Sequence, residues 1–329
     1  MTRRRYTRDE ILAEHAYDRP LAADGVACHG GFVNDTYVSP RTLWRTQAIT
    51  AWQEGLPAGA LAAVLDPISA RIPPHFPTIE QTRLLVRHGV TMPLVRILSL
   101  IAIIEGYGGE VLRTVPIPAF SDRVHEPIDG TALAHLSPLF EAHARDEAGH
   151  RTMWELARDI ALDHPELPAN LAPNFPPPST VRLLPEVAAD LEAIILRMLG
   201  VLTVEVFAVE AFHWAKAVLG DAAPFARHAE AAALIGYVQQ DEAPHVGYLA
   251  TALAELRVRT LIGDGDAAVC GATVIDRARD LIVEFQTGPR HQANCAFRMQ
   301  VIERCLATHP QRADILAAFA SLGPVPAHA

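Results

Sequence analysis

The stretches DEAGH (Asp146–His150) and DEAPH (Asp241–His245) repeat one pattern, in which a glutamate precedes a histidine by three positions. On an α-helix, residues three apart lie on one face, about one turn from each other. Each stretch can therefore direct one carboxylate and one imidazole at the same metal ion. A single Glu-x-x-His pair is common and is usually a solvated ion pair, but two copies with the same preceding aspartate favour a metal site. The four residues concerned are Glu147, His150, Glu242 and His245.

A further glutamate precedes each copy and lies within a largely apolar helical stripe. Glu105 occurs in AIIEGYGGEV (102–111), and Glu205 occurs in TVEVFAVEAF (203–212). A buried, unpaired carboxylate is costly, and metal ligation is one of the few ways to compensate it. The order Glu, Glu-x-x-His, Glu, Glu-x-x-His is that of a carboxylate-bridged dinuclear site built from four helices. The alternative is a pair of exposed helices with incidental charges and two paired core carboxylates.

The sequence therefore predicts two metal ions held by four carboxylates and two imidazoles. This donor set suits iron or manganese, whereas thiolates would indicate zinc or an iron–sulfur cluster. The four carboxylate charges match two divalent ions, and the same glutamates are the candidate catalytic residues because carboxylates can shift between terminal and bridging modes. The predicted ligands are Glu105, Glu147, His150, Glu205, Glu242 and His245.

This ligand order resembles that of the ferritin-like di-iron carboxylate oxygenases and oxidases. Members include bacterial multicomponent monooxygenases, ribonucleotide reductase small subunits, arylamine N-oxygenases and aldehyde-deformylating oxygenases. The last group is locally most similar, because its first ligand helix also reads like IIEG and its third like VEVFAVEAF. The resemblance covers about residues 90–255 and selects Glu105 over Glu110 and Glu205 over Glu210. It implies an all-α, ferritin-like four-helix bundle with extra N- and C-terminal helices.

The resemblance also gives a role to the aspartate that begins each motif. In the superfamily, such an aspartate accepts the N–H of a ligand histidine on the neighbouring helix. Asp146 would thus orient His245, and Asp241 would orient His150, which fixes the imidazole tautomer and raises its basicity. The alternative is ordinary charge on a helix surface.

The function that the resemblance implies is an O₂-activating non-haem di-iron monooxygenase or oxidase. We expect a small, largely apolar or aromatic organic substrate, as in specialised metabolism, and two iron ions, with manganese or a mixed manganese–iron pair as options. Electrons would come from a ferredoxin or reductase, and a homodimer is compatible with the sequence. The alternatives are a ferritin-like ferroxidase or iron-binding protein, a dimanganese catalase and a metal-free helical partner subunit.

Composition excludes several other classes. Half of the 329 residues are apolar, and the net charge of −10 argues against a nucleic-acid surface. The longest apolar runs, 97–104 and 198–204, are too short to span a bilayer. No apolar stretch follows the N-terminal arginines, so we expect no signal peptide and a cytoplasmic protein. The four cysteines lack C-x-x-C spacing and are interpreted as reduced thiols without a ligand role.

The expected organisation is one structural domain in three parts. Residues 1–80 form an N-terminal extension, 81–260 the bundle, and 261–329 helices that pack on it. Within these parts we expect short helices at 7–16 and 41–55, a loop at 29–40 (HGGFVNDTYVSP), a break at 71–77, a loop at 262–272 and two helices in 273–322. The ligand helices are expected at 90–115, at 137–164 with Ser137 as N-cap, at 185–219, and at 224–256, with a Pro-rich connection at 165–184.

Two local features bear on the ligand helices. Glycines at 106, 108 and 109 follow Glu105 directly. They indicate either close approach of a substrate, with a local bulge, or tight packing against another helix. Pro244 lies inside the second motif and cannot donate a backbone hydrogen bond, so a bend is expected there.

Overall fold

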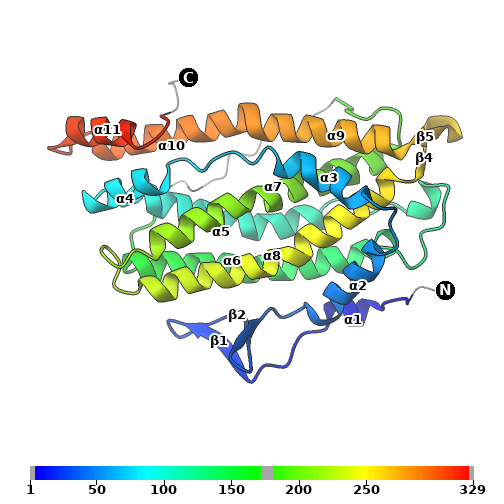
Figure 1. Cartoon of the computed structure of the whole chain (residues 1–329), viewed down its shortest axis with the longest axis horizontal. Coiled ribbons are helices and arrows are strands. Elements are labelled where there is room, and N and C mark those ends of the chain that lie inside the picture. Colours follow the sequence, from blue (N-terminus) through cyan, green and yellow to red (C-terminus); the bar gives the residue numbers. More distant parts are fainter. Residues whose placement is uncertain (1–3, 170, 172–180, 326–329) are drawn as a thin grey trace.

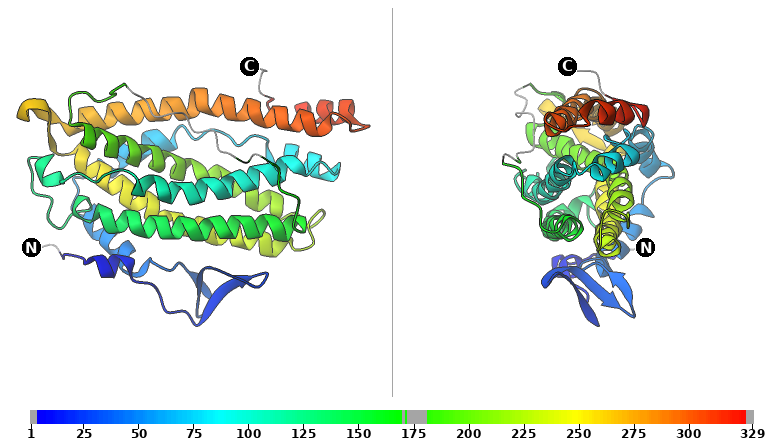
Figure 2. Two further views of the ribbon diagram at one scale, coloured as in Figure 1. Left: turned by 180° about the vertical axis from the view of Figure 1, so that it is seen from behind. Right: turned by 90° about the vertical axis from the view of Figure 1, so that its left-hand side faces the viewer.

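Four long helices dominate the computed structural model, which describes residues 4–169, 171 and 181–325 (Figure 1). Most of these residues are helical, as the sequence predicted. The long helices lie side by side in the end-on view of Figure 2. They are α5 (Met92–Arg113), α6 (Leu136–Leu162), α7 (Ala189–Leu219) and α8 (His228–Arg257). Each carries the ligand residues that the sequence assigned to it.

The start of α6 differs from the prediction. A 3₁₀ turn at Leu133–His135 precedes the helix, and Ser137 lies inside α6 rather than capping it. The Glu255 carboxylate of α8 instead accepts the N–H groups of Ala132 (2.9 Å) and Leu133 (3.3 Å). Glu255 thus caps the 3₁₀ turn that leads into α6 from more than one hundred positions away, so local sequence could not indicate it.

The other ligand helices are closer to expectation. α7 begins at Ala189, later than predicted, and its C-cap is Gly220 as predicted. α8 is continuous from His228 to Arg257, through Pro244. Of the Pro-rich connection, residues 170 and 172–180 lie outside the described part of the chain.

Close packing of α5 against α6 explains two of the glycines. A Cβ atom at Gly109 would lie 2.6 Å from the Cα of Ala144, and one at Gly106 would lie 2.8 Å from the Cδ of Arg151. A Cβ at Gly108 would make an ordinary 3.8 Å contact with the Glu147 carboxylate. Gly109 is therefore required by helix packing, since no real Cβ sits that close to a backbone atom.

The N-terminal segment contains a small sheet where a loop was expected. Strands β1 (Arg19–Ala23), β2 (Val26–Val33) and β3 (Thr36–Val38) follow α1 (Arg8–Leu12) and pair antiparallel in that order. The loop prediction for 29–40 was wrong because Asn34 and Asp35, at φ 48° and 60°, form a two-residue hairpin turn that joins β2 to β3. Next come α2 (Leu43–Gln53), α3 (Ala60–Ser69) and α4 (Ile79–Arg87), of which α3 and α4 were not predicted.

The C-terminal segment lies along one side of the four long helices (Figure 1). The expected loop at 262–272 contains a hairpin of β4 (Thr260–Ile262) and β5 (Ala268–Cys270). The helices after it are α9 (Gly271–Phe285), a π-helical turn (Gln286–Arg290), α10 (His291–Leu306) and α11 (Arg312–Ser321). Val274, Ile275 and Ala278 of α9 join the core formed by α7 and α8, so α9 packs on the long helices.

The apolar core has two main parts along the length of the long helices. One cluster includes Leu139 of α6 and Leu199 of α7, and the other includes Leu98 of α5 and Trp154 of α6. Along the axes of the long helices, the ligand residues lie between these two clusters. Within the described residues, no helix combines the length and hydropathy that crossing a membrane requires.

Replacing Gly109 with Ala should destabilise the fold by about 1–3 kcal/mol, because the new methyl group overlaps the Ala144 backbone. Gly200→Ala on α7 is the matched control, since a Cβ there meets nothing within 4 Å. That change should stabilise the fold by roughly 0.5–1 kcal/mol. Urea unfolding measures both, and an unaltered Gly109→Ala protein would show that close helix packing does not require this glycine.

Candidate metal centre

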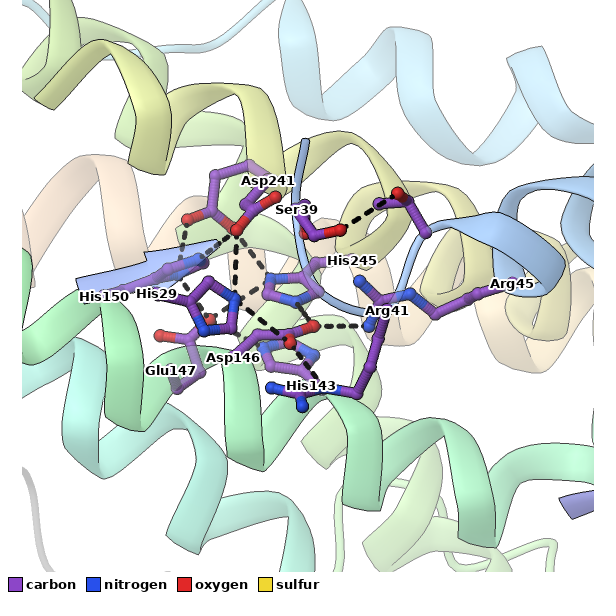
Figure 3. A network of polar contacts seen from close by, with 12 residues as sticks. His29, Ser39, Arg41, Arg45, His143, Asp146, Glu147, His150, Asp241 and His245 are labelled. Atoms are coloured by element: carbon purple, nitrogen blue, oxygen red, sulfur yellow. Dashed lines mark hydrogen bonds and ion pairs between the residues drawn. The ribbon is translucent and has the colours of Figure 1, made fainter. Parts of the chain in front are cut away.

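The six predicted ligands meet in one buried layer, part of which is shown in Figure 3. His150 and His245 have no exposed side-chain surface, and Glu147 and Glu242 are almost as fully buried. Glu105 and Glu205 retain 12% and 11% exposure. The six come from four different helices, so packing of the long helices brings them together.

Two of the glutamates contact both histidines. The Nδ1 atom of His150 lies 3.1 Å from Oε1 of Glu242, and the Nδ1 atom of His245 lies 2.8 Å from Oε2 of the same residue. Oε1 of Glu147 lies 3.7 Å and 3.2 Å from these two nitrogens. Glu105 lies on the His150 side, where its Oε2 is 3.7 Å from Nδ1. Glu147 and Glu242 are thus central, and Glu105 is peripheral.

His143, one turn before Glu147 on α6, also faces this layer. Its Nε2 atom lies 3.1 Å from Oε1 of Glu147 and 3.2 Å from Oε1 of Glu205. Its ring stacks on that of His245 at a centroid distance of 3.8 Å. The predicted ligand set does not include His143. Its spacing of four from Glu147 was the signal that could have identified it.

Several of these atoms lie close together without forming hydrogen bonds. Four buried atoms have no hydrogen-bond partner among the described residues: Nε2 of His143, Oε1 of Glu147, Nδ1 of His150 and Oε1 of Glu242. Their separations would permit hydrogen bonds, but their directions do not. A buried polar atom without a partner costs about 1–3 kcal/mol. These atoms belong to two neighbouring groups of possible ligands, and a cation in each group would satisfy them, so these residues fit metal ions.

The two motif aspartates hold the far sides of the histidines. Nε2 of His245 lies 3.2 Å from Oδ2 of Asp146, and Nε2 of His150 lies 3.3 Å from Oδ2 of Asp241. These are the cross-helix pairs that the resemblance implied. Both aspartates are fully buried, which excludes the alternative of ordinary surface charge. With Nε2 bonded to an aspartate, the Nδ1 atom of each imidazole is directed at the glutamates.

The N-terminal segment supplies two arginines and a histidine that lie against the aspartates (Figure 3). Arg41 donates from Nε to Oδ1 of Asp146 at 2.9 Å, and Arg45 donates from Nη1 to Oδ2 at 2.5 Å. Nε2 of His29 lies 3.1 Å from Oδ2 of Asp241 and 3.3 Å from Oδ1 of Asp146. Sequence reasoning missed all three residues, because it treated the segment as an extension unconnected to the site.

Glycine in the first motif makes room for His29. A Cβ atom at Gly149 would lie 2.5 Å from Nδ1 of His29, so any other residue there would displace the imidazole. The hydroxyl of Tyr37 lies 3.2 Å from the His29 carbonyl oxygen and 3.3 Å from Oδ2 of Asp241. Tyr37 also stacks on Tyr237 of α8. The sheet is thereby fixed to the helices that carry the motifs.

Burial and crowding favour protons on the two outer glutamates. Burial raises the pKa of Glu105 well above its ordinary value, and the charge of Glu147 adds to this. Burial, reinforced by the charge of Glu242, raises the pKa of Glu205 to about 8. Without metal ions, each of these two carboxyl groups therefore holds a proton at neutral pH.

The pKa values of the two ligand histidines and of the two aspartates shift in opposite directions. Burial opposes charge on His150 and His245, but the Glu242 carboxylate and the other acidic neighbours together outweigh it and raise the pKa of both well above the ordinary value. Burial likewise opposes charge on Asp146, and the Arg45 guanidinium holds its pKa well below the usual range. Two protons on the imidazoles and two on the outer glutamates thus add four positive charges to the layer. Two divalent ions would supply the same number.

Three groups of described side chains have ligand atoms close enough to hold a metal ion, and all belong to this layer. They are His143–Glu147–Glu205–His245, Glu147–His150–Glu242–His245 and His29–His150–Asp241, and none includes a cysteine. Comparisons with protein-family models, curated proteins and solved structures returned no match. The candidate metal centre is therefore defined by the geometry of these groups.

Metal-free protein should lose stability as the pH rises from 4.5 to about 8. The unfolded chain ionises Glu205 at the lower value, whereas the folded chain keeps the proton until the upper one. The folded state binds more protons across this interval, so the free energy of unfolding falls. The raised pKa values of His150 and His245 act in the same direction above 6.5.

Metal-loaded protein should lack this slope, because the ions displace those protons. The check is the melting temperature of chelated and metal-loaded protein over the same pH series. A chelated protein whose melting temperature stays constant or rises over this interval contradicts the assignment of protons to these groups.

Asp241→Asn should weaken metal binding about 10–100-fold while the fold is retained, because the Nε2–H of His150 loses its charged acceptor. Asp190→Asn, which disturbs an ion pair with Arg123 at the start of α7, is the matched control. Calorimetric titration with ferrous iron under nitrogen measures both variants. Equal affinities for Asp241→Asn and wild type would mean that the aspartate does not act through the histidine.

Proposed function

We propose that this protein is a ferritin-like di-iron oxidoreductase that uses O₂ to oxidise a small organic molecule. The observation that carries the proposal is the set of buried ligand atoms without hydrogen-bond partners among the described residues, aimed at one region between the two repeated motifs. The supporting arrangement is that of ferritin-like proteins, in which four helices direct single glutamates and Glu-x-x-His pairs inward.

The contacts suggest how the ligands would divide between two ions. Glu147 and Glu242 reach both ligand histidines and would help to hold both ions. Glu105 would complete the position beside His150, and Glu205 the position beside His245. These oxygen and nitrogen donors suit iron, with manganese or a mixed pair as alternatives. The bound ions would supply the redox chemistry with O₂.

The protein's own residues would hold protons and exclude water. Asp146 and Asp241 keep a proton on Nε2 of each ligand imidazole, which leaves Nδ1 directed at the metal position. Apolar clusters above and below the layer keep bulk water away from it. A dry site strengthens the electrostatic interactions inside it and protects reactive species.

The exposed parts of the centre indicate the substrate class. Glu105 on α5 and Glu205 on α7 keep some exposure, whereas the ligand histidines keep none. Access is therefore from the side of α5 and α7. Tyr107 and Val209 on these helices are 43% and 40% exposed. These exposed side chains support a small, largely apolar or aromatic substrate that approaches from this side. A ferredoxin or reductase would supply electrons to the centre.

Protein expressed in iron-replete medium should contain about two iron ions per chain, as the paired ligand sets require. Glu205→Gln should lower this content, whereas Glu210→Gln, on the same helix outside the ligand set, should not. Elemental analysis with protein quantitation is the measurement. Metal-free or zinc-only wild-type protein would falsify the proposal.

A second measurement separates the proposal from its alternatives. Reduced, iron-loaded protein should consume O₂ stoichiometrically and more rapidly with an apolar or aromatic substrate present. Repeated oxidation of added ferrous iron with deposition of ferric oxide would instead show a ferroxidase. Rapid dismutation of hydrogen peroxide by manganese-loaded protein would show a catalase.

A further inference from the structure

We infer that His143 is a seventh metal ligand, oriented by Tyr248, and that it makes the two metal positions unequal. The inference rests on the proposed function, since it takes the centre to hold two ions. Its basis is the juxtaposition of an unpartnered, fully buried imidazole nitrogen with two ligand glutamates on one side and a buried phenol on the other.

The Nε2 atom of His143 has the properties of the ligand atoms around it. It is buried and lacks a hydrogen-bond partner among the described residues, although carboxylate oxygens of Glu147 and Glu205 lie within 3.2 Å. An N–H at this position would be drawn into line with one of those oxygens. The ring instead lies parallel to that of His245, with an interplanar angle of 7°, and both imidazoles face Glu147.

Tyr248 fixes the other nitrogen of His143. Its hydroxyl lies 2.8 Å from Nδ1, and both side chains are fully buried. When Nδ1–H donates to the phenol oxygen, Nε2 keeps a lone pair directed at the glutamates. A partner on the second imidazole nitrogen is the usual means of fixing a ligand tautomer. Asp146 and Asp241 do the same for His245 and His150, so all three imidazoles are held in one manner.

The internal repeat shows that this pair is confined to one half of the centre. An offset of 95 positions superposes the first motif on the second, and it relates His143 to Val238 and Met153 to Tyr248. Val238 and Met153 are both fully buried in one apolar cluster. The half of the centre with His150 therefore has an apolar pair where the half with His245 has an imidazole and a phenol.

Unequal donor sets should give unequal metal positions. The position beside Glu205 would have two imidazoles, His143 and His245, whereas the position beside Glu105 would have one. Nitrogen donors favour metals later in the first-row series, and carboxylates suit manganese better. The two positions should therefore fill in sequence, and a mixture of iron and manganese should place iron preferentially beside His143.

The test is an anaerobic titration of metal-free protein with Co²⁺, followed by calorimetry and by visible absorption of the bound ion. Wild type should bind two ions with separate affinities. His143→Gln keeps an amide donor for the neighbouring carboxylates but removes the imidazole. It should weaken one binding step by about 10–100-fold, change the absorption of that ion and leave the other step unaltered. His213→Gln, an exposed histidine on α7, is the matched control and should match wild type.

Two further variants protect the test against a folding defect. The double variant His143→Val/Tyr248→Met introduces beside His245 the same valine and methionine pair that Val238 and Met153 form beside His150. It should fold and show two similar binding steps. His143→Ala leaves a buried space, and added imidazole should restore the wild-type Co²⁺ spectrum. Tyr248→Phe should show a smaller loss of affinity, about tenfold.

The outcomes separate this inference from the proposed function. Two bound ions with unaltered affinities and spectrum in His143→Gln would overturn the ligand role and leave the di-metal centre standing. The same holds if the double variant retains two unequal steps and imidazole has no effect on His143→Ala. Wild-type protein that binds no Co²⁺, iron or manganese would remove the proposed function itself.

Discussion

Neutralising a buried layer of negative charge is the constraint on which the rest of the structure depends. Six carboxylate groups lie in this layer: Glu105, Glu147, Glu205, Glu242, Asp146 and Asp241. Charges removed from water need close partners, or they change protonation state. Arg41 and Arg45 offset two of the six charges. The remaining four correspond to two divalent ions, or to the protons that stand in for them.

The layer is ordered from outside to inside. Arginines contact an aspartate, the aspartates contact Nε2 of the histidines, and the histidines direct Nδ1 at the glutamates. The pKa directions follow this order, because Asp146 lies next to fixed positive charge whereas Glu105 lies among other carboxylates. Both oxygens of the Asp146 carboxylate are therefore satisfied within the protein. The inner groups, which are the glutamates and the Nδ1 atoms of the histidines, would be satisfied by bound cations.

Local patterns predicted the four long helices and the six candidate ligands that the structure brings into one layer. The spacing of Glu147 and His150, and the apolar stripe around Glu105, are properties of single helices that depend only on helical periodicity. His143 lies on the same face of α6 as Glu147 and His150, but its partner Tyr248 belongs to another helix. The reciprocal pairing of Asp146 with His245 also spans two helices, and only the resemblance to known di-iron enzymes suggested it.

The remaining parts of the site depend on contacts between residues far apart in the chain. Arg45 pairs with a residue 101 positions away, and the 3₁₀ turn before α6 is capped by Glu255, 123 positions from Ala132. The segment 29–40 was misinterpreted for a local reason. Its Gly, Asn and Asp content is typical of loops, yet two of those residues form a tight hairpin turn. Because the sheet was not predicted, no position could be expected for His29.

The placement of the N-terminal segment sets the order in which the centre is assembled. Arg41 meets Asp146, 105 positions away, and Tyr37 meets Asp241, 204 positions away. Contacts across such long loops carry a high closure entropy and form late. This segment can thus take up its position only after α6 and α8 are in place. Until then, the aspartates lack their cationic partners and the centre is uncovered on that side. Docking of this segment is the step that encloses the centre.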